Sequence, residues 1–387
     1  MRGALVAAML VVASIGFDYV PAHARDLNHP MTAPSVERTS AIRLPNESNA
    51  SVSRIVFSPD GRYLAVLVDN ASRRVSDIIV WDLKLDQEQS RIENLPIYAF
   101  PYIKISWSPN GRYISLGMGG QGWPMKLWNP LTGAVEKELD VKSALPSVSS
   151  RDGSKLLVNT TPIVYLNPIE GSYRVYDTRS WNFRDYSADG LMVQTLAWTS
   201  DQKVILAGVW PKWSVGRSID GVTPQMSDVL VRRVDPDGIE NSRTVIVGHG
   251  IAMAGRPDVI LAGPVSCATS TTDSSGDMLA LGSGHINVLN TKTLSTVFFY
   301  APSESDSIRE ALPDGALGAN VAFSHDGKFL FLGGQGTEKS LIIEALTGAE
   351  VGTFSSGRRG IAVSPDGKTL AQGNGNSVYL LTLKNSE

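Results

Sequence analysis

The stretch Ser58-Pro59-Asp60-Gly61 stands between two short apolar segments, Ile55-Val56-Phe57 and Tyr63-Leu64-Ala65-Val66. Its proline fixes φ at the first turn position, and its aspartate can accept hydrogen bonds from the nearby backbone. Its glycine readily adopts the positive φ of a hairpin connection. The stretch therefore predicts two antiparallel β-strands joined by a tight turn.

This hairpin is repeated along the chain. Comparable turns occur at Ser108-Pro109-Asn110-Gly111, Arg151-Asp152-Gly153, His325-Asp326-Gly327 and Ser364-Pro365-Asp366-Gly367. Two weaker copies are Asp201-Gln202 and Asp273-Ser274-Ser275-Gly276. Most copies follow one another after roughly 40 to 50 residues, which leaves room for four short strands and is typical of a β-propeller blade. Helical periodicity is almost absent, so the sequence predicts an all-β fold.

The two ends of the repeat array complement each other. Residues 39–45 form a strand candidate without a nearby partner, and the last unit ends after the strand at 378–383 without a fourth strand. If the first strand fills the last unit, the ring closes and the exposed edge of an open array disappears. The prediction is an all-β, seven-bladed β-propeller of four-stranded antiparallel blades, closed by an N-terminal strand that completes the last blade.

The first 24 residues have the three regions of a signal peptide. Arg2 supplies a positive charge, residues 4–15 are apolar but too short to span a bilayer, and Ala22-His23-Ala24 is a small-x-small cleavage site. We predict cleavage after Ala24, a flexible leader over 25–38 and a propeller over 39–387. No later segment of the sequence reaches membrane-spanning length. The mature protein is expected to be exported, either periplasmic or secreted.

Composition indicates an ordinary globular protein. The chain has 387 residues, of which 42% are hydrophobic and 19% are charged, and its formal net charge is −3. A basic surface for nucleic acid would require an excess of Lys and Arg, so no nucleic-acid partner is expected.

Several strands resemble those of the WD40 repeat family. Ile79-Val80-Trp81-Asp82-Leu83 and Lys126-Leu127-Trp128-Asn129-Pro130-Leu131-Thr132-Gly133 resemble its third strand and the turn that follows. The Ser-Pro-Asp-Gly turns resemble its first turn, and Gly248-His249 matches its Gly-His pair. The resemblance covers roughly residues 40–386. Together with the signal peptide, it implies an exported bacterial propeller that serves as a non-catalytic binding scaffold.

No catalytic residue, metal site or cofactor is predicted. Gly117-Met118-Gly119-Gly120-Gln121-Gly122 matches G-x-G-x-x-G, but Trp123-Pro124 and a strand follow where a dinucleotide site requires the N-terminus of a helix. The motifs H-E-x-x-H and G-x-S-x-G are absent from the sequence. The histidines of the mature chain have no second ligand at metal-site spacing: His29, His249, His285 and His325.

The predicted binding site rests on the distribution of long loops. In a blade, the connections after the second and fourth strands lie on one face of the ring. In this chain several of these connections are long, namely 94–102, 159–172, 210–227, 248–263 and 301–318. Long loops on a rigid scaffold commonly carry function, and aromatic residues are common interface anchors. The candidate binding residues are Tyr98, Phe100, Tyr102, Trp123, Tyr165, Trp210, Trp213, Arg217 and His249. Packing of the aromatic residues against their own loops is the competing interpretation.

The sequence thus favours a scaffold that binds a protein or peptide partner through the face with the long loops. One alternative is a periplasmic propeller enzyme or enzyme subunit, resembling lactonase or quinoprotein propellers. That reading needs polar residues that converge at the channel mouth, for which Asp228, Arg217, His249 and Asp306 are candidates. Another alternative is a binder of carbohydrate or cell-wall fragments through the same aromatic residues. The sequence leaves the ligand and the oligomeric state open.

Overall fold

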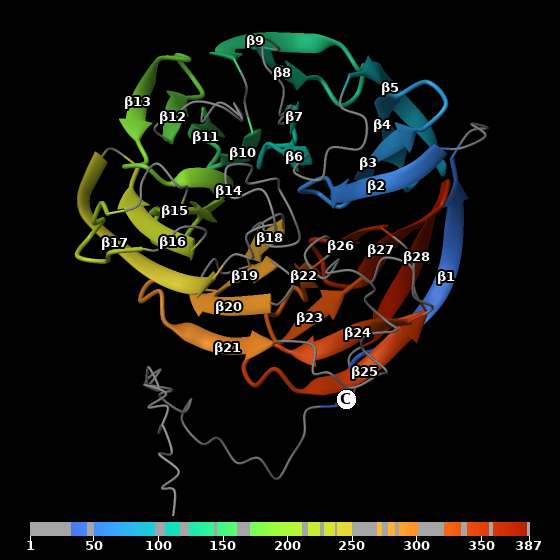
Figure 1. Ribbon diagram of the computed structural model, residues 1–387. Coiled ribbons are helices and arrows are strands. Elements are labelled where there is room, and N and C mark those ends of the chain that lie inside the picture. Colours follow the sequence, from blue (N-terminus) through green and yellow to red (C-terminus); the bar gives the residue numbers. More distant parts are fainter. Residues whose placement is uncertain are drawn as a thin grey trace, which may run out of the picture. The chain divides into compact units, whose positions relative to one another are not determined.

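Antiparallel sheets of four strands make up all the regular structure that can be described (Figure 1). The computed structural model describes residues 32–44, 50–96, 105–116, 124–142, 145–160, 171–210, 216–224, 228–236, 238–249, 269–272, 278–282, 286–300, 321–333, 339–355 and 359–384. All of these residues belong to one compact unit, Met31–Glu387.

The strands form seven sheets, which we number along the chain. Sheet 1 contains β2 (Ala50–Phe57), β3 (Tyr63–Asn70), β4 (Val75–Asp82) and β5 (Gln87–Leu95). Sheet 2 contains β6 (Ile105–Trp107), β7 (Ile114–Leu116), β8 (Pro124–Trp128) and β9 (Val135–Lys142). Sheet 3 contains β10 (Leu145–Ser149), β11 (Lys155–Asn159), β12 (Ser172–Asp177) and β13 (Phe183–Ser187). Sheet 4 contains β14 (Met192–Trp198), β15 (Val204–Val209), β16 (Asp228–Asp235) and β17 (Gly238–His249).

The remaining three sheets follow the same order of strands. Sheet 5 contains β18 (Thr269–Thr272), β19 (Met278–Gly282), β20 (Ile286–Asn290) and β21 (Thr296–Tyr300). Sheet 6 contains β22 (Val321–Phe323), β23 (Phe329–Leu332), β24 (Lys339–Glu344) and β25 (Glu350–Ser355). Sheet 7 contains β26 (Arg359–Val363), β27 (Thr369–Asn374), β28 (Ser377–Lys384) and, as its fourth strand, β1 (Ser35–Arg43).

The first strand of each sheet lies next to the first strand of the following sheet, and β26 returns to β2. The innermost strands therefore close a ring, and Figure 1 shows the sheets following one another around it. Two indoles tie neighbouring inner strands together. Trp107 Nε1 donates a hydrogen bond of 3.3 Å to the carbonyl of Val56, and Trp198 Nε1 donates one of 3.1 Å to that of Val148. This arrangement is a β-propeller.

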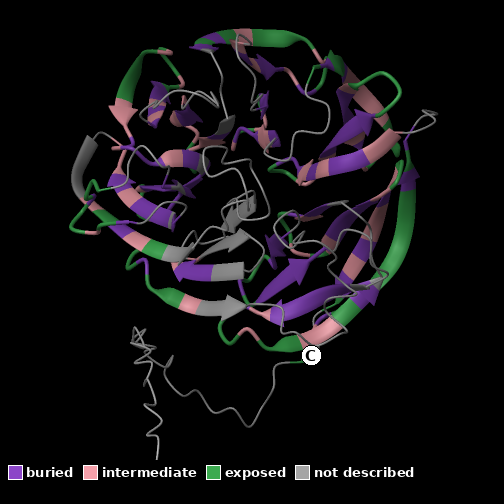
Figure 2. Cartoon of the chain, viewed as in Figure 1, coloured by how far each residue is buried: buried purple, intermediate pink, exposed green. Residues whose placement is uncertain are grey.

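Burial falls from the inner strands to the outer ones, as Figure 2 shows. Every residue of β3 except Tyr63 is buried, because the faces of the sheet are covered by its neighbours. The outermost strand β5 keeps only Ile92 and Leu95 buried. Apolar clusters fill the spaces between adjacent sheets, so the core is divided into wedges.

The predicted closure by the N-terminal strand is confirmed. β1 pairs with β28 from Ser35 opposite Lys384 to Arg43 opposite Ser377. The strand therefore begins at Ser35 rather than at Thr39, so part of the predicted leader is ordered as a strand. Ile42 is its only buried residue, which means that backbone pairing provides most of its attachment.

The first turn of a sheet has one repeated geometry. In sheet 1, Ser58 Oγ donates to Asp60 Oδ1 at 2.6 Å and accepts from the Tyr63 N–H at 2.8 Å. Gly61 adopts φ of 71° and donates its N–H to the Ser58 carbonyl at 2.9 Å. Sheet 4 builds the same turn with Thr199, and Gln202 takes the glycine position with φ of 60°.

The predicted count of seven blades needs a correction. The regular blade with this turn is seen six times, not seven, in the described residues: in sheets 1, 2, 3, 4, 6 and 7. In sheet 5, the residues that join β18 to β19 lie outside the described part of the chain. The described part of its first strand is Thr269–Thr272, and residues 265–268 of the predicted strand lie outside the described residues.

Among the described residues, no helix has the length and apolar character that would carry it across a bilayer.

Candidate functional site: the loop-bearing end of sheet 4

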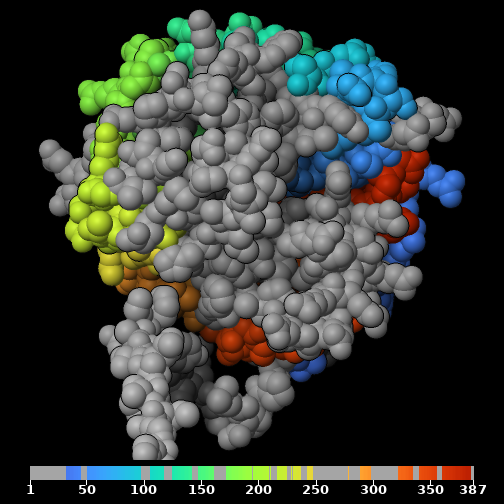
Figure 3. All heavy atoms as spheres, in the orientation of Figure 1, coloured from blue at the N-terminus to red at the C-terminus, as the bar shows by residue number. Residues whose placement is uncertain are grey.

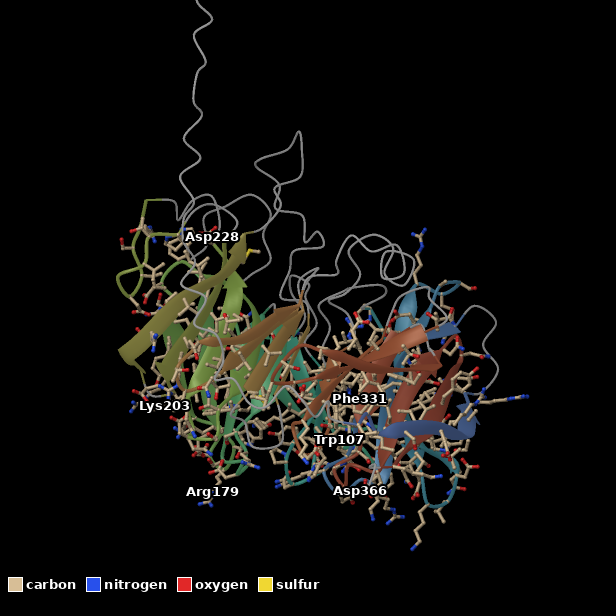
Figure 4. All side chains as sticks on the ribbon, turned by 90° about the horizontal axis from the view of Figure 1, so that it is seen from below. Trp107, Arg179, Lys203, Asp228, Phe331 and Asp366 are labelled. Atoms are coloured by element: carbon tan, nitrogen blue, oxygen red, sulfur yellow. The ribbon has the colours of Figure 1, made fainter. Side chains whose placement is uncertain are left out.

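The strands end at two opposite faces, which Figure 4 shows in side view. Asp228 lies at one end of the strands, and Arg179, Lys203 and Asp366 lie at the other. We call the Asp228 end the loop face, because the second and fourth strands of the sheets end there. The opposite end is the turn face. Figure 3 views the ring as Figure 1 does and shows the described residues following one another around its rim in sequence order.

Most of the predicted site residues cannot be placed. Those outside the described residues are Tyr98, Phe100, Tyr102, Trp123, Tyr165, Trp213 and Asp306, together with the 117–122 glycine stretch. Their assignment to a binding site stays a prediction.

Three of the remaining candidates lie in one row at the loop-face end of sheet 4. The Trp210 N–H donates a hydrogen bond of 2.8 Å to the carbonyl of Asp228, the first residue of β16. Asp228 in turn pairs in register with His249, the last residue of β17. The structure therefore brings together residues that are nearly 40 positions apart in the sequence.

Trp210 serves the core. Its side chain is fully buried in the wedge between sheets 3 and 4, in one cluster with Tyr173, Leu191 and Ile219. The burial of Trp210 agrees with the competing interpretation, in which the aromatic residues of the long loops anchor these loops by packing and do not bind a partner. Asp228 is also buried, whereas Arg217 is exposed on the loop that joins β15 to β16.

The described part of this loop, residues 216–224, is a small hairpin. Ile219 and Val222 exchange two backbone hydrogen bonds of 2.9 Å. Between them, Asp220 and Gly221 have φ of 50° and 79°, as in a type I′ turn. Ile219 is buried, so the hairpin is fastened to the core on one side.

A second Asp-Gly turn lies beside it, where sheet 3 passes into sheet 4. Asp189 and Gly190 have φ of 49° and 90°, and the Leu191 N–H donates to the Ala188 carbonyl at 3.1 Å. Both flanking residues are fully buried. Two turns of one type therefore lie side by side: one connects sheet 3 to sheet 4, and the other belongs to the β15–β16 loop of sheet 4.

The buried guanidinium of Arg232, on β16, joins the two turns. Its Nη1 lies 2.6 Å from Asp189 Oδ2, and its Nε lies 3.3 Å from Asp220 Oδ2. Asp220 also accepts hydrogen bonds from Ser242 Oγ at 2.5 Å and Thr244 Oγ1 at 2.6 Å, both on β17. The loop is thus held by one cation and two hydroxyl groups of its own sheet.

The network has one positive charge and two negative ones. Burial alone would raise the pKa of the Asp220 carboxyl, but the hydrogen bonds from Ser242 and Thr244 and the charge of Arg232 outweigh it. The pKa is therefore below its ordinary value of 3.8. Next to the network, Tyr173 is stacked on Tyr186 with 5.2 Å between ring centroids. Burial raises the pKa of the Tyr173 phenol, which stays neutral.

Sequence reasoning missed Asp189, Asp220 and Arg232. A usable signal was present for the turns, because Asp-Gly between apolar residues is a strong short-range hairpin indication. The sequences Ala188-Asp189-Gly190-Leu191 and Ile219-Asp220-Gly221-Val222 both have it. Nothing in the sequence indicates that the two aspartates share one arginine.

The arrangement is suited to presenting a loop in a fixed shape. In the described part of the chain, no three His, Cys, Asp or Glu side chains come together in a way that could hold a metal ion. Each carboxylate of the network is engaged by Arg232, so the described residues support positioning rather than proton transfer.

Comparison with known proteins agrees with this fold. No family model matches the chain. Among solved structures, the β-propeller domain of Cps50 (Swd1) from Myceliophteria thermophila is similar, with a TM-score of 0.59 and 15% sequence identity. The match covers 90% of this chain and 99% of that one. The β-propeller fold implied by the WD40 resemblance is therefore confirmed, and at this identity the likeness establishes the fold alone.

Proposed function

We propose that the protein is a non-catalytic scaffold that binds a protein or peptide partner through its loop face. The observation that carries this proposal is the attachment of residues 216–224 by Asp220, Arg232, Ser242 and Thr244. A loop that is ordered before binding loses less conformational entropy in a complex than a free one does. The loop presents the exposed Arg217, and arginine is among the residues enriched at interface hot spots.

A pull-down from the exported compartment tests the loop face. Arg217→Glu is the informative variant, because Arg217 is exposed, whereas replacing the buried Trp210 would disturb the core. Lys368→Glu is the matched control, since Lys368 is an exposed cation in a first turn on the opposite face. We expect wild type and the control to recover the same partner, and Arg217→Glu to recover at least tenfold less. Equal recovery by all three proteins would contradict the proposal.

We also propose export to the periplasm or medium, with cleavage after Ala24. The support is the three-part segment of the first 24 residues. N-terminal sequencing of the mature protein should start at Arg25. A mature protein that still begins at Met1 would contradict export by this route.

A further inference from the structure

The connections between third and fourth strands contain an unusual residue in sheet 3. In sheets 2, 5 and 6, the fifth residue of this turn has positive φ and donates its N–H to the carbonyl four residues earlier, as Gly133, Leu294 and Gly348 do. In sheet 3 the position is held by Trp181, with φ of 60° and a hydrogen bond of 2.7 Å to Asp177. A large side chain in this region is strained, and such strain persists where the surroundings compensate it.

Leu294 has an evident compensation, because its side chain is buried in an apolar cluster between sheets 4 and 5. Trp181 is half-buried: one side packs against the apolar cluster between sheets 2 and 3, and the other is open to solvent. Its ring centroid lies 6.2 Å from that of Tyr113, on sheet 2, and 6.3 Å from that of Tyr176. The Nζ of Lys137, on the outer strand β9, lies 5.1 Å from the Trp181 ring centroid.

The aromatic surface continues onto β13. Phe183 is 46% exposed, and its ring centroid lies 5.4 Å from that of Tyr176. The guanidinium of Arg174 covers one side of the Phe183 ring at 3.7 Å. We call Lys137, Arg174, Tyr176, Trp181 and Phe183 the aromatic strip. Figure 2 colours the beginning of β13 as exposed, so the strip is open at the rim.

The carboxylates beside the strip already accept hydrogen bonds, whereas two nearby cations form no ion pair with a described residue. Asp185 is bound by both Arg174 Nε at 2.6 Å and Nη2 at 2.8 Å. Asp177 accepts three hydrogen bonds from Arg179 and Ser180 inside its own turn. Among the described residues, by contrast, neither Lys137 nor the exposed Arg179 has a carboxylate at ion-pair distance. Both cations can therefore still pair with carboxylates of a partner, although Arg179 is attracted by Asp177 of its own turn.

We propose that the aromatic strip is a docking surface for an acidic protein segment that carries one aromatic or large apolar anchor. The anchor would pack on Phe183 and Trp181, and its acidic neighbours would pair with Lys137 and Arg179. Aromatic residues and arginine are the types enriched at interface hot spots, and complementary charge sets partner choice. Because Arg179 lies at the turn face (Figure 4), this surface is separate from the loop face.

Selection from a display library of random 12-residue peptides tests the proposal. The mature protein is the bait. We expect enrichment of peptides in which Asp or Glu flank a Trp, Phe or Leu. One enriched peptide is then synthesised and its affinity is measured for wild type, Phe183→Ala and the double variant Lys137→Glu/Arg179→Glu. Each variant should bind at least tenfold more weakly, and binding to wild type should weaken as salt is raised.

Matched controls separate docking from folding. Leu346→Ala removes an apolar side chain of similar exposure, 43%, from the equivalent turn of sheet 6, and Lys368→Glu reverses an exposed charge. Both controls should bind the peptide like wild type, and all variants should melt within a few degrees of it. Failure to enrich acidic peptides, or equal binding by strip and control variants, would overturn the proposal. Specific binding of an oligonucleotide in place of peptides would also overturn it.

Discussion

Arg232 Nη1 and Asp189 Oδ2 lie 2.6 Å apart, although Arg232 is on a strand of sheet 4 and Asp189 is in the turn that connects sheet 3 to sheet 4, 43 positions earlier in the chain. The same guanidinium also binds Asp220, so one buried cation joins two Asp-Gly turns. The side chain of Asp189 is 40% exposed and that of Asp220 is 17% exposed. The two carboxylates should therefore contribute unequally to stability.

We expect Asp220→Asn to lower the free energy of unfolding by about 2 to 3 kcal/mol, since it removes charge-assisted hydrogen bonds and weakens the pairing of a buried cation. Asp189→Asn should cost about 1 kcal/mol or less, because water screens the more exposed pair. Urea unfolding of both variants measures the difference. Equal losses would contradict the unequal contributions expected from the different exposures of the two carboxylates.

Two turn glycines of the same conformation allow a controlled test of packing between neighbouring turns. Gly367 and Gly111 have φ of 71° and 70°. A Cβ added at Gly367 would lie 2.7 Å from the Cβ of His325, whereas one added at Gly111 would have no atom within 4 Å. Alanine at either position should cost about 1 to 2 kcal/mol for its left-handed backbone. Gly367→Ala should cost about 1 to 3 kcal/mol more for the overlap.

Thermal and urea unfolding of Gly367→Ala and Gly111→Ala provide the comparison. A similar loss in both would mean that the turns of sheets 6 and 7 can separate without cost. A larger loss for Gly111→Ala would contradict the packing described here.

The strain at Trp181 can be measured with two truncations. Trp181→Ala and Trp181→Gly both remove the ring and its contacts with Tyr113 and Tyr176. Only the glycine variant relieves the cost of positive φ, as Gly133 and Gly348 do in the equivalent turns. We expect the glycine variant to be more stable than the alanine variant by about 1 kcal/mol. If alanine proved equal or better, the turn would not impose this conformation.

Acid should weaken the first turns. In the Asp152 turn, hydrogen bonds from the Ser150 hydroxyl and from the N–H and hydroxyl of Ser154 lower the pKa of the carboxyl from 3.8 to about 2. A carboxyl with a lower pKa in the folded state stabilises the fold above its unfolded value, and this contribution is lost as the pH falls from about 4 toward 2. Hydrogen bonds likewise lower the pKa of the Asp366 carboxyl.

Titration of Asp152 by NMR in wild type and in Ser150→Ala checks this account. The substitution removes the largest cause of the shift, so the pKa of Asp152 should rise toward 3.8. Matched melting curves should show that the variant loses less stability than wild type between pH 4 and pH 2. An unchanged pKa would rule out the hydroxyl as the cause.

The sequence by itself determined the repeating unit. Ser58, Asp60 and Gly61 form a turn through contacts within five residues, so the pattern of turn residues and alternating apolar segments is sufficient to predict it. The closing strand could also be predicted, since one unpaired strand at each end of an array of repeats implies their pairing. The first turn of sheet 5 lies outside the described residues, so its prediction stays untested.

Only the tertiary structure decided the role of single residues at the candidate site. Trp210 has the sequence of a loop aromatic, but its burial depends on sheet 3, whose residues come earlier in the chain. The same holds for Arg232, whose partners lie 43 and 12 residues away. Such contacts form between sheets when the ring closes, and local propensity and periodicity carry no information about which side chains meet there.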